Sequence, residues 1–89
     1  MATMMRALMN DFYDLRKGNE DNLSYGMAID QAVAYANSCH QLTSCDTLNR
    51  VEGLLKDALD IVYDDGEIKA FEDALIVVEL HREKLLTEG

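Results

Sequence analysis

The chain has 89 residues and a mass of 10.0 kDa, which is enough for one small domain and not for two. Its apolar fraction of 48% excludes a disordered chain, and the lack of any long apolar run excludes a membrane-spanning helix. Seventeen acids against eight bases give a net charge of −9, the wrong sign for direct binding to nucleic acid or to an anionic membrane.

The first two predicted helices are read from the spacing of apolar residues. In the first, over residues 3–17, these residues share one face, and Gly18 is expected to end the helix with a positive φ. The second, over residues 24–40, follows an N-cap at Asn22 or Ser24, and its many alanines should let a neighbouring helix approach closely. The two apolar faces consist of Met5, Leu8, Phe12 and Leu15 in the first helix and of Tyr25, Ile29, Ala32, Val33 and Ala36 in the second.

The third and fourth predicted helices have wider apolar faces. The third, over residues 47–63, is capped by Asp46 or Thr47 and holds Gly53, which either marks a close helix crossing or is simply tolerated. The apolar arc of the fourth, over residues 67–86, is too wide for one surface stripe, so this helix is central or covered by a second copy. The two faces consist of Leu48, Val51, Leu54, Leu55, Ala58, Leu59, Ile61 and Val62, and of Ile68, Phe71, Leu75, Ile76, Val77, Val78, Leu80 and Leu85.

These patterns predict a compact all-α fold, an antiparallel four-helix bundle that forms a single domain over residues 1–89. A homodimer is the alternative to a monomer. A strand over residues 74–80 is a local alternative, but the helical spacing continues through that stretch. The polar residues Asn10 and Asp11 interrupt the start of the chain, so we expect no secretory signal and a cytoplasmic protein.

The connection before the fourth helix resembles the later half of an EF-hand calcium loop. Asp65, Gly66 and Glu72 occupy the fifth, sixth and twelfth positions of such a loop. The first and third positions are Ile61 and Tyr63, which offer no carboxylate. We therefore expect no calcium site, and we interpret the acids as residues that favour the N-terminus of a helix.

Cysteines and histidines supply the right ligand types for zinc, but not the right spacing. Cys39 and His40 are adjacent and point apart on a helix, so a closed site with Cys45 and His81 is not expected. Both histidines are predicted on the helix surface, and the two cysteines are either small buried or half-buried thiols or a disulfide across a turn. No nucleophile elbow or phosphate loop is present, so we expect no enzyme, no cofactor and no metal.

The clearest functional signal is the charge of the segment from Asp57 to Asp73, which holds seven acids and one base. Asp57, Asp60 and Asp64 are three and four residues apart and are expected to share one helical face. Such a face either docks on a basic surface or only keeps the protein soluble. Tyr63 is the predicted anchor, with a position at the core boundary as its alternative. The candidate partner-binding residues are Asp57, Asp60, Tyr63, Asp64, Asp65, Glu67, Glu72 and Asp73.

These features predict a non-enzymatic module that inhibits a partner protein by engaging a basic, nucleic-acid-holding surface. In size and charge the chain is similar to phage-encoded inhibitors of host-defence nucleases, anti-CRISPR proteins among them, and to DNA mimics, which implies the host cytoplasm. Colicin immunity proteins are also acidic four-helix chains, but their Tyr-Tyr-Pro segment is absent here. The alternative is a self-associating structural or regulatory protein, with the Met-rich first helix or another seam as its contact.

Overall fold

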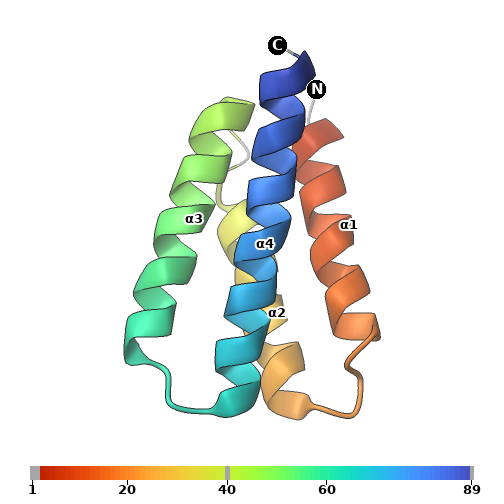
Figure 1. Cartoon of the computed structure of the whole chain (residues 1–89), viewed down its shortest axis with the longest axis vertical. Coiled ribbons are helices and arrows are strands. Elements are labelled where there is room, and N and C mark those ends of the chain that lie inside the picture. Colours follow the sequence, from red (N-terminus) through yellow and green to blue (C-terminus); the bar gives the residue numbers. More distant parts are fainter. Residues whose placement is uncertain (1–2, 40, 89) are drawn as a thin grey trace.

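The computed structural model describes residues 3–39 and 41–88, which form four α-helices (Figure 1). In chain order they are α1 (Thr3–Lys17), α2 (Leu23–Asn37), α3 (Ser44–Ile61) and α4 (Asp65–Glu88). No strand occurs within the described residues, so the stretch 74–80 is helical, as its spacing predicted. The predicted all-helical fold with four helices is confirmed.

Successive helices run in opposite directions, so the α1–α2 and α3–α4 connections lie at the same end of the molecule (Figure 1). α1 begins and α4 ends at the other end. α4 packs against all three other helices and most extensively against α2, whereas α1 and α3 touch least. The bundle is therefore closest along the α2–α4 diagonal, and the central place of α4 accounts for most of its broad apolar arc.

Small side chains explain the close contact between α2 and α4. Ala28, Ala32 and Ala36 of α2 are buried, as are Ala70 and Ala74 of α4. A methyl group takes up little space, so the two backbones approach more closely than helices with large contact residues. The close approach predicted for the alanine-rich second helix is thus present.

The predicted apolar faces supply the core, but those of α3 and α4 are narrower than expected. Ile61 is 73% exposed at the end of α3, Ile76 and Leu80 are exposed on α4, and Leu75 is only half-buried. The prediction is wrong for Ile61, which does not widen the buried stripe of α3, and for Leu75, which is not at the centre of the stripe of α4. Ile76 and Leu80 lie on a side of α4 that the other helices leave open, and the predicted alternative that a second copy covers it is not tested by a single chain. The large side chains at the centre of the core are Leu8, Phe12, Tyr25, Ile29, Leu48, Val51, Leu55, Phe71 and Val78.

α3 begins three residues earlier than predicted, at Ser44. Thr43 is its N-cap, with Oγ1 accepting a hydrogen bond from the backbone N–H of Asp46 at 3.2 Å. Thr47, which was predicted as a cap, is buried, and its hydroxyl donates to the carbonyl oxygen of Cys39 at 3.4 Å. The prediction of Asp46 or Thr47 as the cap is therefore wrong, because both residues lie inside the helix.

The ends of α1 and α2 also differ from the prediction. α2 ends at Asn37, and residue 40, where its end was expected, lies outside the described residues. Asn22 is confirmed as its N-cap, since Oδ1 accepts from the backbone N–H of Tyr25 at 3.1 Å. Gly18 has no positive φ, and neither has any other described residue, so the predicted left-handed cap is wrong. Its backbone N–H continues the helical hydrogen bonding of α1 instead.

Two glycines in helices have opposite surroundings. A methyl group at Gly53 would meet nothing within 4 Å, so no helix crossing requires this glycine. At Gly66, in the first turn of α4, a methyl group would lie 2.7 Å from Oδ1 of Asn22 and 3.0 Å from Oδ1 of Asp64 and Cβ of Ser24. Gly66 therefore allows the first turns of α2 and α4 to touch.

We expect alanine to have opposite effects at these two positions. Gly53→Ala should raise the free energy of unfolding by about 1 kcal/mol, because alanine favours the helix and restricts the unfolded chain. Gly66→Ala should lower it by about 1–3 kcal/mol, because the new methyl group displaces the oxygen of Asn22 that caps α2. Urea denaturation measures both, and a stabilised Gly66→Ala variant would contradict the close contact of the two first turns.

Candidate functional site

The structure distributes the predicted acidic segment over several places. Asp57 and Asp60 lie exposed on the last turns of α3, and Glu72 lies exposed on α4. Asp64 is in the connection between the two helices, because Val62 has an extended backbone with ψ 148° and ends α3. The prediction that Asp64 shares a helical face with the two acids of α3 is therefore wrong.

Asp64 joins the first turns of α2 and α4. Its Oδ1 accepts hydrogen bonds from the backbone N–H of Gly66 at 2.7 Å and of Glu67 at 3.2 Å, which caps α4. Its Oδ2 accepts from the hydroxyl of Ser24 at 3.0 Å. These hydrogen bonds lower the pKa of Asp64, and the bond from Ser24 has the largest effect. Among the predicted binding residues, Asp64 is thus a structural cap.

The lowered pKa of Asp64 predicts a pH-dependent contribution to stability. The contribution is complete above the unfolded-state pKa near 3.8 and is lost as the pH falls through the lower folded-state pKa. Asp64→Asn keeps an oxygen for capping but cannot titrate. We expect this variant to be less stable than wild type near pH 7, and the difference to shrink below about pH 4. Urea midpoints at several pH values test this, and a constant difference would contradict it.

Asp73 is also used within the fold. The hydroxyl of the buried Tyr25 donates to Oδ2 of Asp73 at 2.7 Å, and Nζ of Lys69 lies 3.0 Å from the same oxygen. The Lys69 ammonium lies 5.6 Å from the centroid of the Tyr25 ring. Burial, then the bond to Asp73, raises the pKa of Tyr25, so the phenol stays protonated. Asp73 ties α2 to α4, and its carboxylate is half-buried rather than free on the surface.

The fold brings a second acidic connection to the same end as the first. Glu20 and Asp21 are exposed between α1 and α2, and the bond from Ser24 to Asp64 joins that region to the α3–α4 connection. Sequence reasoning missed these two acids, although an antiparallel bundle places its first and third connections at one end. We name this surface the acidic end, defined as Glu20, Asp21, Asp57, Asp60, Tyr63, Asp65 and Glu67.

Within the described residues, no ion pair or side-chain hydrogen bond engages the six carboxylates of the acidic end. Among the described bases of the adjoining helix turns, only Lys17 has no ion pair. The others are paired with acids outside this surface: Arg16 with Asp30 at 2.9 Å, Lys56 with Glu52 at 3.7 Å and Lys69 with Asp73 at 3.0 Å. The charge of the acidic end is therefore only weakly compensated by its surroundings.

Tyr63 is the most exposed large hydrophobic side chain that the structure describes. It is 94% exposed in the α3–α4 connection, and Ile61, two residues earlier, is 73% exposed. The alternative that Tyr63 sits at the core boundary is wrong, because the chain leaves α3 in an extended conformation and carries the ring away from the bundle. The acidic end thus combines free carboxylates with an aromatic ring that packs on nothing in the core.

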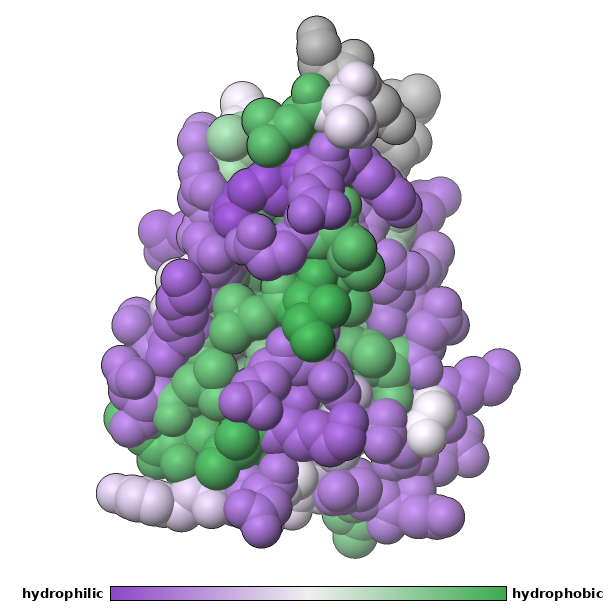
Figure 2. All heavy atoms as spheres, viewed as in Figure 1, coloured by the Kyte–Doolittle hydropathy of each residue, from purple (hydrophilic) through white to green (hydrophobic). Residues whose placement is uncertain are grey.

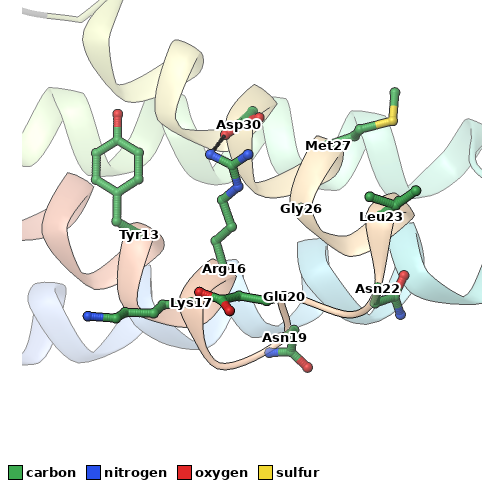
Figure 3. Close-up of a pocket in the computed structure, with 10 residues that line it drawn as sticks. All are labelled: Tyr13, Arg16, Lys17, Asn19, Glu20, Asn22, Leu23, Gly26, Met27 and Asp30. Atoms are coloured by element: carbon green, nitrogen blue, oxygen red, sulfur yellow. Dashed lines mark ion pairs between the residues drawn. The ribbon is translucent and has the colours of Figure 1, made fainter.

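A hollow of about 410 Å³ lies between α1 and α2, next to the acidic end (Figure 3). Arg16 reaches across it to Asp30, with Nη1 and Oδ1 2.9 Å apart. A methyl group at Gly26 would lie 3.5 Å from Nε of Arg16, which is an ordinary contact, so the arginine does not require a glycine there. Leu23 and Met27 are strongly exposed on its rim. The lining consists of an apolar rim around an ion pair. Such a lining favours contact with another molecular surface over a catalytic site.

The other candidate reactive groups are occupied or apart. Cys39 is buried and Cys45 exposed, and both thiols are free. His81 is buried, with Nε2 2.7 Å from Oδ2 of Asp11 on α1, so its predicted surface position is wrong. His40 lies outside the described residues. No three His, Cys, Asp or Glu side chains in the described part of the chain are arranged to hold a metal ion.

Comparison of the chain with protein-family models, with curated proteins and with solved structures found no match. None of the helices formed by the described residues has the length and apolar character that crossing a membrane requires.

Proposed function

We propose that this protein is a non-enzymatic binding module whose acidic end docks on a basic surface of a partner protein. The observation that carries the proposal is Tyr63, which is 94% exposed at the end of the bundle that also carries six carboxylates with no partner within the described residues. A tyrosine ring is apolar with a polar tip, which favours it as an interface anchor. The surrounding carboxylates attract lysine and arginine and speed the encounter with a surface rich in them.

A strongly basic protein surface is typical of a site that binds nucleic acid. Docking of the acidic end there would exclude the phosphate backbone, so the module acts as an inhibitor. Phage-encoded anti-defence proteins, including anti-CRISPR proteins, and DNA mimics act in this way. Such a partner places the protein in the cytoplasm, that of the host if a phage encodes it.

Competition with DNA tests this function. The protein is immobilised, exposed to a nuclease-treated bacterial lysate, and washed with increasing salt or with a double-stranded DNA oligonucleotide. We expect a retained protein to be released steeply by salt, because exposed charges are screened beyond about 8 Å at physiological ionic strength. We also expect the oligonucleotide to displace it. Retention that DNA leaves unchanged would contradict binding to a nucleic-acid surface.

Self-association is a second candidate function, favoured by a different surface. Ile76 is 59% exposed and Leu80 53% exposed, one turn apart on α4. A pair of large apolar side chains in water is stabilised when a second copy covers it. Sedimentation velocity over a range of concentrations detects such a dimer.

A further inference from the structure

The outer side of α4 carries a row of four exposed side chains at a spacing of four residues. The row consists of Glu72, Ile76, Leu80 and Lys84, an acid, two apolar residues and a base. Figure 2 shows hydrophobic residues over the middle of α4, with hydrophilic ones above and below. Residues four apart form one continuous ridge on a helix, and this one is about 18 Å long.

Neither charge of the row is used within the bundle. Among the described residues, Glu72 and Lys84 have no ion pair and no side-chain hydrogen bond. They lie about 18 Å apart along α4, too far to pair with each other. The neighbouring acid Glu79 differs, because Arg82 binds it and also binds Glu52 at 3.2 Å. The ends of the row therefore remain available for partners outside the chain.

The order of the row makes it complementary to itself when one copy is reversed. We propose that two copies of this chain pair through α4, antiparallel about a twofold axis between Ile76 and Leu80. Each Ile76 then meets the partner's Leu80, and each Glu72 meets the partner's Lys84. Every contact occurs twice, as an isologous interface requires. Ridges of this spacing pack together when the helix axes cross at about 50°.

The charges favour this arrangement over others. A parallel pairing of the same rows would place Glu72 against the partner's Glu72 and Lys84 against the partner's Lys84, and like charges in contact are repulsive. A partner of unrelated sequence is not expected to carry the complementary order, which is a base, two apolar residues and an acid. The inference concerns the second candidate function and is independent of the acidic end, which the paired rows do not include.

The expected dimer is weak. Stable complexes bury about 800 Å² of surface on each partner, and a single helix ridge buries less. The two copies also repel each other, because each carries a net charge of −9. Association should therefore be measured near 0.15 M salt, where long-range repulsion between the copies is screened, and at protein concentrations up to about 1 mM.

Charge reversal tests the pairing. Glu72→Lys and Lys84→Glu should each weaken self-association about tenfold, because each places like charges together at both ends of the interface. An equimolar mixture of the two variants should form a heterodimer about as strong as the wild-type dimer, since one copy carries two bases and the other two acids. The variant with both changes should also recover self-association. These substitutions are on exposed positions, so circular dichroism should show an unchanged fold.

Two controls isolate the row. Asp14→Lys makes the same change in net charge as Glu72→Lys, at an exposed position outside both the row and the acidic end, and it should leave dimerisation as strong or slightly stronger. Ile76→Ser with Leu80→Ser should abolish it. Sedimentation velocity reports all of these. A dimer that forms equally well in the single variants and in their mixture would contradict pairing through this row, but not self-association by another surface. A chain that stays monomeric at every concentration would refute both and leave the proposed role of the acidic end intact.

Discussion

Leu55→Ala is expected to lower the free energy of unfolding by about 2–5 kcal/mol. Leu55 is fully buried at the centre of α3, and removal of its branched side chain leaves a cavity among the side chains of the core. Domains of this size have a total stability of about 5–15 kcal/mol, so this one change removes a large part of it. Urea denaturation followed by circular dichroism measures the effect.

Leu75→Ala is the matched control for this experiment. The sequence places Leu55 and Leu75 alike at the centre of apolar stripes, whereas in the structure Leu75 is only half-buried and packs at the margin of the core. The same truncation should therefore cost clearly less at position 75, because less apolar area is exposed by unfolding and no enclosed cavity remains. Equal losses at the two positions, or a loss below about 1 kcal/mol for Leu55→Ala, would contradict the packing described for α3.

The second large effect concerns the acidic end. Replacement of Asp57, Asp60 and Asp65 together by asparagine removes three charges and keeps the size of the side chains. We expect slower association with a basic partner and a flatter dependence on salt, because peripheral charges act mainly on the encounter. Stability should hold or rise slightly, since repulsion between nearby acids is relieved. Asp64 is left unchanged because its carboxylate caps α4.

A variant with the same change in net charge separates position from total charge. Asp14→Asn, Asp46→Asn and Glu83→Gln alter three exposed acids that lie outside the acidic end. We expect this variant to bind the partner nearly as fast as wild type. If the two triple variants behave alike in rate and in salt response, the acidic end has no special role.

Tyr63→Ala addresses the anchor separately from the charges. An aromatic residue at the centre of an interface typically contributes about 2 kcal/mol or more to binding, mostly through slower dissociation. Because the ring packs on nothing in the core, the variant should fold with unchanged stability. Surface plasmon resonance against the captured partner should therefore show faster dissociation, and unchanged dissociation would remove Tyr63 from the binding surface.

The helices were predictable because their signal is local. Apolar residues spaced three and four apart, such as Leu8 and Phe12 in α1 or Leu48, Val51 and Leu55 in α3, specify both the helix and the side that is buried. The width of the buried side was not predictable. It depends on how many neighbours a helix has, and Ile61, Ile76 and Leu80 resemble buried residues in sequence although no helix covers them.

Contacts between residues far apart in the chain decided the remaining differences. His81 is buried because Asp11, seventy residues earlier, supplies a hydrogen bond at 2.7 Å. Asp64 is a cap because α3 ends before it and Ser24 faces it from α2. The acidic end was predicted in part, because the charge of the α3–α4 connection can be read from consecutive residues. Glu20 and Asp21 were missed, because they reach the same end only through the antiparallel direction of the helices.

The position of the two outer helix ends has a mechanical consequence. α1 begins and α4 ends at one end of the bundle, and these two helices are in contact (Figure 1). A force that pulls these ends apart acts across the helix axes, so contacts between α1 and α4 open one after another rather than together. The bond between Ser24 and Asp64 and the close contact at Gly66 lie at the far end of a molecule 37 Å long. Under tension the acidic end is thus the last part of the bundle to come apart.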